Sequence, residues 1–551
     1  MKPTQILFMG GAGEVGLNAT LYQQGDEAVL LDFGAYLGDP RPSINRVVPD
    51  PGPLFRNARR LHGVVLTHGH EDHLGAIAYL MRSLRVPVYG APFGLELTRS
   101  RLNEAGFHQP DLRAVDPGKP FRLGPFEVEL LSVTHSIPDA CMVSLKTDQA
   151  RFLHTGDFKL DSDPVGQTTD LERLRTLGAA GVDVLLSDST NAERSGRTIS
   201  ERAVLDALED EIRRARGKVV VTLFASHVHR ISGLFEIARR TGRRVCLLGL
   251  SMVKNVEAGR KLGFLPRDLE VIPSEVANRL PSDRVLCLAT GTQGEPQGAL
   301  ARIGRSSSPV FIETGDTVIL SCRTIPGREL AVRAILNQLV GRGIHVRSPR
   351  ERPELHTSGH AEAQEHRELL DLVSPQYLVP FHGDRVMMEA HAETARRWGM
   401  PAERILIPED GAIFEWTEGR LTRAGKEDVP SIPIGGTGPL NWSVVGARER
   451  MGRSGALAVL VHLDASSRPS RDPWVQSLGF HLEPSERAAL IDALRRDLDD
   501  ALFIDRDQML EIILRSLQHS LGLRRSELPW VQADWHFDEP HADSRSLHTR
   551  S

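Results

Sequence analysis

The pattern of apolar and polar residues gives the first part of this 551-residue chain, up to about residue 190, a strand-rich character. Apolar residues there fall in short runs, as in residues 63–66, or alternate with polar residues, as in residues 126–130. Both patterns are typical of β-strands. Residues 74–81 form a longer apolar stretch, which predicts a helix. The residues between 66 and 74 are therefore expected to form a loop that joins a strand to a helix.

From about residue 195 the pattern changes to helices that alternate with strands. Residues 201–216 and 230–240 have helical character, whereas residues 219–223 and 245–248 are short apolar runs. Alternation of this kind predicts a parallel sheet with helices on both of its faces.

The last part of the chain has a third pattern. Residues 429–440 are rich in Pro and Gly and are predicted to be a linker. A strand over residues 456–462 and helices over 484–502 and 507–521 then predict a small mixed domain. An apolar helix surface such as the one in residues 509–517 is more often core than interface. The polar tail from His541 is expected to be disordered.

Composition indicates a soluble, cytoplasmic protein. The four cysteines, at positions 141, 246, 287 and 322, have no CxxC spacing, so we expect a reducing compartment and no disulfide framework. The N-terminus lacks the apolar region of a signal peptide, and no apolar run is long enough for a membrane helix.

The formal net charge of −5 argues against binding nucleic acid with the whole surface. A nucleic-acid-binding protein of this charge would need a local basic groove, for which the basic runs 213–218 and 239–244 are candidates. Solvated helix ends are the favoured interpretation of both runs. Aromatic residues make up only 5% of the chain, so base stacking should be sparse and backbone contacts should dominate.

Residues 67–73, Thr-His-Gly-His-Glu-Asp-His, carry the strongest chemical signal. In an extended segment, side chains two positions apart point the same way, so His68 and His70 can bind one metal ion together. Asp72 and His73 can face a second ion. The alternative, a chance cluster on a solvated loop, is far less common even in a chain with 21 histidines.

Further candidate ligands follow other predicted strands. His135 comes after the strand around 126–130, Asp157 ends the run 151–157, and Asp32 ends the run 29–32. A single His or Asp at a strand end is more often a cap or a turn residue. As an ordered series after the first motif, however, these residues reinforce the prediction of a metal site.

A second motif, Gly11-Ala12-Gly13-Glu14-Val15-Gly16, has the spacing of a dinucleotide-binding loop, with Asp32 about twenty residues further on. That loop requires a long helix after the glycines. Residues 19–22, a turn at 24–26 and residues 27–31 instead predict a β-hairpin. A nicotinamide site is therefore rejected.

Taken together, the candidate ligands resemble those of the metallo-β-lactamase superfamily. The stretch 154–159 followed by 186–192 is similar to the β-CASP nucleases and, within them, to the ribonuclease J family. The resemblance covers residues 1 to about 425 closely and the last hundred loosely. The further matching segments are residues 289–296, 326–329, 356–360 and 380–384.

This resemblance implies an α/β fold. The expected architecture is a metallo-β-lactamase αββα sandwich with an inserted β-CASP α/β domain and a small α+β C-terminal domain. The expected boundaries are 1–193 and 361–428 for the metallo-β-lactamase domain, 194–360 for the insert, 429–446 for the linker, 447–540 for the C-terminal domain and 541–551 for the tail.

The resemblance also implies a centre of two zinc ions per chain, or of manganese or magnesium, which ligand sets of His and Asp also accept. His68, His70 and His135 would hold the first ion. Asp72, His73 and His382 would hold the second, and Asp157 would bridge the two. A hydroxide shared by the metals would attack the phosphodiester. Asp32 and Asp188 would orient ligand imidazoles or the water, and His360 would donate a proton to the leaving 3′ oxygen.

Substrate contacts implied by the family fall in two segments. They comprise Ser226, His227, Val228 and His229 in the first segment, and His356, Thr357, Ser358, Gly359 and His360 in the second. This chain carries His227 where relatives often have Asn. The implied activity is 5′-3′ exonuclease and endonuclease cleavage of single-stranded RNA, preferably 5′-monophosphorylated, in mRNA decay and rRNA maturation.

Other functions remain as alternatives. The first is another hydrolase of the same fold, such as a β-lactamase, a glyoxalase-type thioesterase or a DNA nuclease; the insert and His360 argue against small substrates. The second is a catalytically silent, RNA-binding scaffold of a decay complex, against which the complete ligand set argues. As partners we expect RNA, a second copy in a homodimer or homotetramer, and proteins of an RNA-decay complex.

Overall fold

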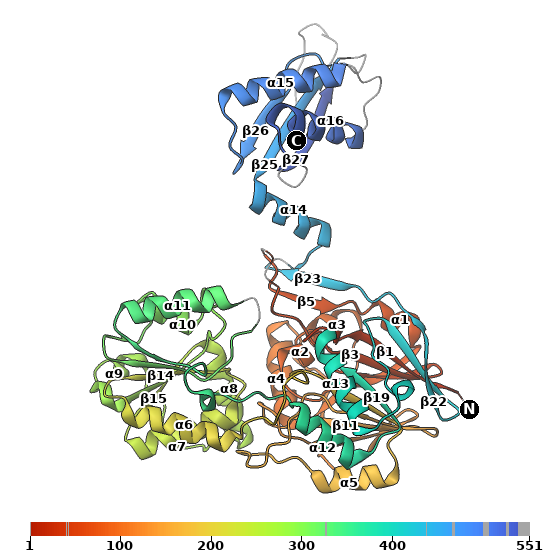
Figure 1. The fold of residues 1–551 in the computed structure, drawn as a ribbon, viewed down its shortest axis with the longest axis vertical. Helices are drawn as coiled ribbons and strands as arrows, with labels where there is room; N and C mark the ends of the chain where they lie inside the picture. The colour runs from red at the N-terminus through yellow and green to blue at the C-terminus, as the bar shows by residue number, and fades with distance from the viewer. Residues whose placement is uncertain are drawn as a thin grey trace. The chain divides into compact units, whose positions relative to one another are not determined.

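A computed structural model of the chain describes residues 2–39, 41, 43–325, 328–436, 438–464, 469–499, 506–524 and 528–537 (Figure 1). The chain forms two compact units. The first comprises Met1–Gly38 and Arg46–Ser431, and the second comprises Asp39–Asn45 and Ile432–Ser551.

Two sheets in the first unit face each other across an apolar core. Tyr22 from one sheet packs edge-on against Phe152 from the other, with ring centroids 5.7 Å apart. The strands, in sheet order, are β22 (Arg420–Lys426), β21 (Ala412–Thr417), β1 (Thr4–Gly10), β3 (Ala19–Gln24), β4 (Glu27–Leu31), β6 (Arg60–Val65), β7 (Val88–Gly90) and β8 (Leu112–Ala114) in the first sheet, and β19 (Tyr377–Phe381), β13 (Val184–Asp188), β12 (Arg151–His154), β11 (Cys141–Lys146), β10 (Phe126–Ser132) and β9 (Phe121–Leu123) in the second.

Helices cover the outer faces of these sheets. The helix α4 contacts β7 and β8 of the first sheet, and α13 contacts β19 of the second. Leu153 and Leu185 on the outer face of the second sheet pack in one cluster with Leu174 and Leu369 from helices. The arrangement is the expected αββα sandwich. The helices of this part are α1 (Gly52–Asn57), α2 (Glu71–Leu74), α3 (Ile77–Ser83), α4 (Pro92–Glu104), α5 (Leu171–Ala180), α12 (Ala363–Val373) and α13 (Arg385–Trp398).

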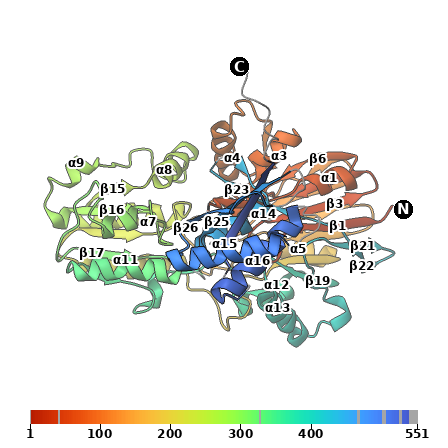
Figure 2. The ribbon, with the colours of Figure 1, turned by 90° about the horizontal axis from the view of Figure 1, so that it is seen from above.

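An α/β layer is inserted between two neighbouring strands of the second sheet. The chain leaves the sheet after β13 and returns through α12 to β19, which pairs parallel with β13. The insert has a parallel five-stranded sheet of order β15 (Arg244–Leu248), β16 (Val285–Ala289), β14 (Val219–Thr222), β17 (Thr317–Leu320) and β18 (His345–Arg347). Figure 2 shows this layer beside the sandwich.

Helices lie on both faces of the inserted sheet, as the alternating pattern predicted. Val219 and Val221 face α6 (Glu201–Arg214) and α7 (Val228–Thr241), whereas Val220 and Val318 face the opposite side. Ser200 begins α6 by accepting a hydrogen bond from the backbone N–H of Ala203. The other helices of the insert are α8 (Leu250–Leu262), α9 (Ser274–Ala277), α10 (Ala299–Gly304) and α11 (Glu329–Gly341).

The expected hairpin is present as β3 and β4, which pair antiparallel and exclude the long helix of a dinucleotide-binding loop. The helix expected over residues 74–81 is instead split between α2 and α3. The carbonyl of His73 accepts a hydrogen bond from the backbone N–H of Phe33, and that of Glu71 from Ala35. These neighbouring-loop contacts bind the helix residues to the end of β4.

The second unit contains a three-stranded sheet and two helices that share a core. Strand β25 (Ala456–Leu463) pairs antiparallel with β26 (Trp474–Leu478) and parallel with β27 (Trp530–Phe537). Residues of α15 (Pro484–Asp499) and α16 (Arg506–Leu521) pack on it, and Met509 and Ile513 are buried. The apolar surface of the last helix is therefore core, the commoner of the two interpretations.

Two shorter segments complete the description. Within the predicted linker, β23 (Ser431–Gly435) and β24 (Gly438–Pro439) pair antiparallel, so this segment is not irregular throughout. Helix α14 (Trp442–Ser454) follows them. The tail from His541 lies outside the described residues. None of the helices in the part of the chain that the structure describes is long and apolar enough to cross a membrane.

Candidate metal centre

The candidate ligands lie at one edge of the sandwich, on loops that follow strands. Strands β12, β13 and β19 run parallel, so the residues after them meet at the same edge. This places Asp157, Asp188 and His382 close together, although they are far apart in the sequence. The loop 67–73 follows β6 of the facing sheet, and its residues close the group from the other side.

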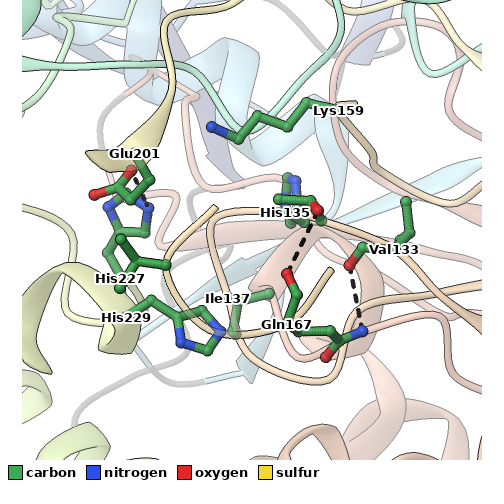
Figure 3. Close-up of a pocket in the computed structure, with 10 residues that line it drawn as sticks. Val133, His135, Ile137, Lys159, Gln167, Glu201, His227 and His229 are labelled. Atoms are coloured by element: carbon green, nitrogen blue, oxygen red, sulfur yellow. Dashed lines mark hydrogen bonds and ion pairs between the residues drawn. The ribbon is translucent and has the colours of Figure 1, made fainter. Parts of the chain in front are cut away.

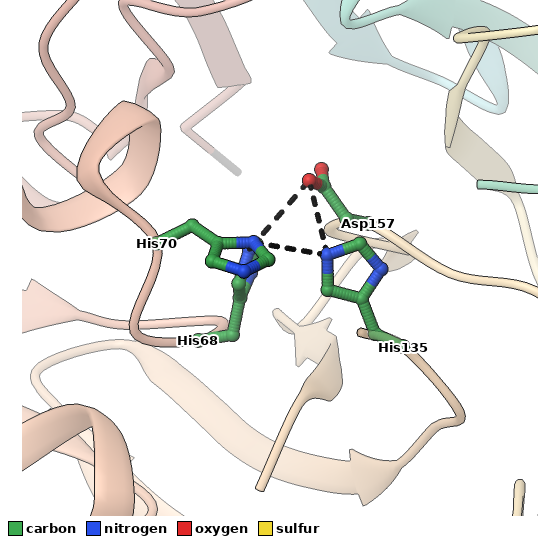
Figure 4. A group of neighbouring side chains, drawn as sticks. All are labelled: His68, His70, His135 and Asp157. Carbon is green, nitrogen blue, oxygen red and sulfur yellow. Dashed lines mark hydrogen bonds and ion pairs between the residues drawn. The ribbon is translucent and has the colours of Figure 1, made fainter. Parts of the chain in front are cut away.

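A first cluster contains three imidazoles and one carboxylate (Figure 4). The ligand atoms of His68, His70, His135 and Asp157 all lie within 4.8 Å of one another. Oδ2 of Asp157 is 3.5 Å from Nε2 of His68 and 3.6 Å from Nε2 of His135. Three nitrogens and one oxygen around a common point match the tetrahedral donor set of zinc.

A second cluster shares Asp157 with the first. Its members are Asp72, His73, Asp157 and His382. Here the other carboxylate oxygen of Asp157, Oδ1, lies 3.1 Å from Nε2 of His73 and 3.0 Å from Nδ1 of His382. One carboxylate thus presents one oxygen to each cluster.

Two buried polar atoms of the second cluster have no hydrogen-bond partner, namely Oδ1 of Asp157 and Nε2 of His382. Burying a polar atom without a partner costs free energy, so buried polar groups in native proteins are normally paired or coordinate metal. These orphaned atoms, together with the donor sets, fit a pair of bound metal ions.

The surroundings fix the orientation of the imidazoles. Asp32 accepts a 2.7 Å hydrogen bond from Nδ1 of His73, which leaves Nε2 of that ring for the cluster. Asp32 also accepts hydrogen bonds from the backbone N–H and the hydroxyl of Thr67. On the other side, Nδ1 of His135 donates to the carbonyl of Gly359 at 2.7 Å. The sequence pointed to Asp32, but it gave no signal for Thr67.

Backbone conformation at two of these positions is uncommon. Asp32 has φ of 58° and His382 has φ of 50°, in the left-handed region that residues other than glycine rarely adopt. Such strain persists only where the surrounding structure over-determines it, and it gathers at functional sites. At His382, the backbone N–H donates to the carbonyl of Gly11 at 2.7 Å, which holds the strained turn.

The two clusters differ in their electrostatics. Burial and the neighbouring His70 lower the pKa of His135 to about 3, so its ring is neutral and available to a metal. Burial also disfavours the charged form of His73, but nearby carboxylates, Asp157 foremost, outweigh it and raise its pKa to about 10. The second cluster therefore attracts positive charge, and a metal ion can replace the protons held there.

His360 lies at the edge of both clusters. Its Nδ1 donates a 2.8 Å hydrogen bond to Oδ2 of Asp188, while its Nε2 lies 3.9 Å from Oδ2 of Asp157. Burial lowers the pKa of His360, but the carboxylates of Asp188 and Asp157 outweigh it and raise the pKa above its ordinary value. The side chain is partly exposed, so its proton can reach a bound molecule.

The first segment implied to contact substrate also reaches the centre. The hydroxyl oxygen of Ser226 lies 3.0 Å from Nε2 of His70. His227 and His229 line a small cavity together with His135 and the buried side chain of Lys159 (Figure 3). In the second segment, Ser358 accepts hydrogen bonds from the side-chain amide of Asn191 and from the backbone N–H of His360.

A buried ion pair supports this cavity. The guanidinium of Arg230, which is fully buried, donates two hydrogen bonds to Glu201, at 2.6 and 2.7 Å. Another of its nitrogens lies 3.2 Å from Nδ1 of His356. Burial, reinforced by the charge of Arg230, lowers the pKa of His356 to about 3 and that of His227 well below its usual value. Both rings are therefore neutral.

The basic runs considered as groove candidates lie mainly at helix ends. Arg213 and Arg240 both pair with Glu209 on the surface of the insert. Arg243 is buried and donates to backbone carbonyls, including those of Gly217 and Val285. Arg213 and Arg240 thus fit the solvated helix ends favoured from the sequence, whereas Arg243 is a buried residue that bonds to backbone.

Family models match three parts of the chain. The family model "Ribonuclease J, beta-CASP domain" matches residues 216–339, the metallo-β-lactamase superfamily model matches residues 12–194, and a model of a zinc-dependent metallo-hydrolase RNA specificity domain matches residues 352–408. Fold and motifs thus define a nuclease of the metallo-β-lactamase superfamily.

Similarity to known proteins extends over most of the chain. Ribonuclease J of Synechocystis sp. is 37% identical over 86% of this chain and 75% of the relative, and that of Thermus thermophilus is 35% identical over 90% and 88%. Ribonuclease J of Mycobacterium tuberculosis is 34% identical over 96% and 94%. The chain belongs to the ribonuclease J family. It is a metal-binding, hydrolytic ribonuclease.

A solved structure shares the fold at low identity. The crystal structure of a protein of unknown function from Enterococcus faecalis V583 superposes with a TM-score of 0.53 and 16% identity. The match covers 75% of this chain and all of that one. It supports the architecture alone.

Proposed function

We propose that the chain uses a two-metal centre to cut single-stranded RNA, both from the 5′ end in the 5′-3′ direction and internally, in mRNA decay and rRNA maturation. The observation that carries the proposal is the pair of clusters joined by Asp157, with the His360 ring held beside them by Asp188. RNA with a 5′-monophosphate is the proposed preferred substrate.

Zinc is the proposed metal, with manganese or magnesium as substitutes. His68, His70 and His135 would hold one ion, and Asp72, His73 and His382 the other, with Asp157 between them. When bound, the metal pair supplies an activated water at neutral pH and offsets the charge that develops on the phosphoryl oxygens. Asp32 keeps the ring of His73 in the tautomer that leaves Nε2 free.

His360 is the proposed proton donor to the leaving 3′ oxygen. Its Nδ1 is held by Asp188, which leaves Nε2 directed towards the clusters. The carboxylates of Asp188 and Asp157 raise the pKa of His360 and so favour the protonated form that a proton donor needs. A general acid whose pKa lies near the working pH combines the correct protonation state with efficient transfer. Asp188 positions the ring, and its other oxygen lies 3.3 Å from Nδ1 of His382.

The segments 226–229 and 356–360, which both reach the candidate metal centre, are the proposed site for the phosphate at the 5′ end. Hydroxyls of Ser226 and Ser358 offer hydrogen bonds beside the centre. With neutral rings, His227 and His356 would act as hydrogen-bond donors rather than as charges. The remaining proposed contacts come from Val228, His229, Thr357 and His360.

One experiment tests the cleavage mode and the acid together. A body-labelled RNA is prepared with a 5′-monophosphate or a 5′-triphosphate and incubated with wild-type protein or His360→Ala, in zinc, manganese or magnesium. We expect mononucleotides from the monophosphate form alone, and their loss in the variant. Internal fragments from both forms would show that endonuclease activity dominates. Complete absence of cleavage would refute the ribonuclease proposal.

We also propose that the chain forms homodimers or homotetramers through its second unit and works with proteins of an RNA-decay complex. Trp474 and Leu478 on β26 are exposed, which supports an interface on that strand. A truncation before Trp442, analysed by light scattering, tests this; an unchanged number of copies per particle would refute it.

A further inference from the structure

An exposed aromatic ring lies at the carboxyl ends of the strands of the inserted sheet. Phe224 follows β14 by two residues and is 39% exposed. In the part of the chain that the structure describes, the other exposed phenylalanines and tryptophans are Phe55, Phe311 and Trp474. Single exposed apolar side chains are common, so the position of Phe224 is what requires an explanation. In parallel sheets, ligands bind outside the carboxyl ends of the strands, which is where Phe224 lies.

A tight turn ties Phe224 to the metal centre. The carbonyl of Phe224 accepts a hydrogen bond from the backbone N–H of His227, which closes a turn over residues 224–227. The Cα atoms at the ends of such a turn lie within about 7 Å of each other. The third residue of this turn is Ser226, whose hydroxyl lies 3.0 Å from Nε2 of His70. The backbone of Phe224 therefore lies close to the candidate metal centre.

An arginine, Arg323, follows the neighbouring strand β17 at the same end of the sheet. Strand β17 pairs with β14 in parallel, with Thr222 opposite Leu320, so Arg323 follows β17 one residue beyond the level of Phe224. Adjacent strands lie about 4.8 Å apart. The side chain of Arg323 is exposed.

The loop that carries Arg323 is held in place by a buried glutamine. The side-chain amide of Gln293 donates a 2.9 Å hydrogen bond to the carbonyl of Arg323. Its side-chain oxygen accepts a 2.7 Å hydrogen bond from the backbone N–H of Ile325, which is itself exposed. A ring, a guanidinium and an apolar side chain thus stand on fixed backbone beside the centre.

We propose that Phe224 stacks on a nucleobase of the RNA strand that enters the metal centre, while Arg323 contacts the backbone of the same strand. The inference rests on the proposed ribonuclease function and names a residue that positions its substrate. Aromatic rings beside a positive charge are the means by which proteins bind single-stranded nucleic acid without sequence preference, because every base has a stacking face. We take the ligand of this surface to be RNA because the turn that carries Phe224 also carries Ser226, which contacts the candidate metal ligand His70.

The test combines protein variants with RNAs that lack one base. The values of kcat/KM are measured for 5′-monophosphorylated oligoribonucleotides, intact or with a single abasic ribose at successive positions from the cleavage site. For wild-type protein, we expect an abasic ribose at one position to lower kcat/KM about tenfold. In Phe224→Ala, kcat/KM on intact RNA should fall by a similar factor, and the abasic ribose should then cause no further loss. Phe224→Trp should retain the wild-type penalty.

Phe311→Ala is the matched control. Phe311 is 62% exposed, and its carbonyl accepts a hydrogen bond from Nζ of Lys218, the residue before β14, so it lies at the opposite edge of the same sheet. This variant should cleave every RNA like wild type. Should Phe224→Ala misfold, as judged by circular dichroism, Phe224→Leu keeps the apolar volume without the ring and should lose most of the abasic penalty.

Two results would overturn the inference. One is wild-type kcat/KM on intact RNA for Phe224→Ala. The other is an abasic penalty of full size in that variant. A wild-type protein that leaves intact RNA uncut would refute the ribonuclease proposal itself, together with the inference that depends on it.

Discussion

Gly34 provides the sharpest structural test of the metal centre. It follows β4, between Phe33 and Ala35, whose backbone N–H groups donate to the carbonyls of His73 and Glu71. A Cβ atom at position 34 would lie 1.6 Å from the carbonyl oxygen of Asp72. Both atoms of this clash are fixed by the backbone, so no rotation of a side chain can relieve it.

The size of the effect follows from this distance. A carbon and a carbonyl oxygen approach to about 3.3 Å, so Gly34→Ala must move the ligand loop by about 1.7 Å. Catalytic groups must be held to within about 0.5 Å, and a displacement of about 1 Å can cost 100-fold in rate. We therefore expect Gly34→Ala to lower kcat at least 100-fold and to weaken binding of the second metal ion, which Asp72 and His73 would hold in the proposed centre.

The assay measures kcat on a 5′-monophosphorylated RNA and the metal content of the purified protein by mass spectrometry. Gly425→Ala is the control, because a Cβ atom at position 425 of β22 would meet no other atom within 4 Å. The control should match wild type in both measurements. If Gly34→Ala retains kcat within a few-fold and binds two metal ions, the ligand loop is not held as described.

Three further predictions follow from the surroundings of the centre. Asp32→Asn should weaken metal binding about 10- to 100-fold, because the amide cannot hold the His73 tautomer as the carboxylate does; competition with a chelator measures this, and unchanged affinity would contradict it. As pH rises through its raised pKa, His360 should lose its proton and the enzyme should lose activity. The alkaline limb of kcat/KM should therefore lie above pH ~6.5, and it should be absent in His360→Ala. Glu201→Gln, which leaves the charge of Arg230 buried without its partner, should lower the free energy of unfolding by about 3 kcal/mol in urea titrations; a change below about 1 kcal/mol would show that the pair is not needed.

The sequence could predict those parts of the site whose metal-binding side chains are concentrated in short stretches. Residues 67–73 indicate a metal site because several potential ligands are adjacent. The strand before them and the helix after them place these residues on a loop. Asp157 and His135 gained meaning from their order after this motif. His382 was assigned through resemblance to a family, because a lone histidine so far along the chain carries no such signal.

The supporting residues could not be predicted, because tertiary packing alone gives them their roles. Glu201 and Arg230 each have the appearance of an ordinary charged residue on an amphipathic helix. Only the packing of α6 against α7 brings them together and buries them. Similarly, Gln293 is a single polar residue in a loop, and its contacts with Arg323 and Ile325 depend on the neighbouring strand. The same reason explains the split of the helix expected over residues 74–81.

The insertion between β13 and β19 has a consequence for synthesis of the protein. His382 follows β19, and its carbonyl accepts hydrogen bonds from the backbone N–H of Ser189 and the hydroxyl of Thr190, just after β13. On the ribosome, β13 emerges long before its partner strand. A nascent chain that has not yet delivered residue 382 lacks a member of the second cluster and cannot close it. Assembly of the second cluster therefore waits for the whole insert to be translated, and a partly synthesised chain lacks the complete set of candidate ligands.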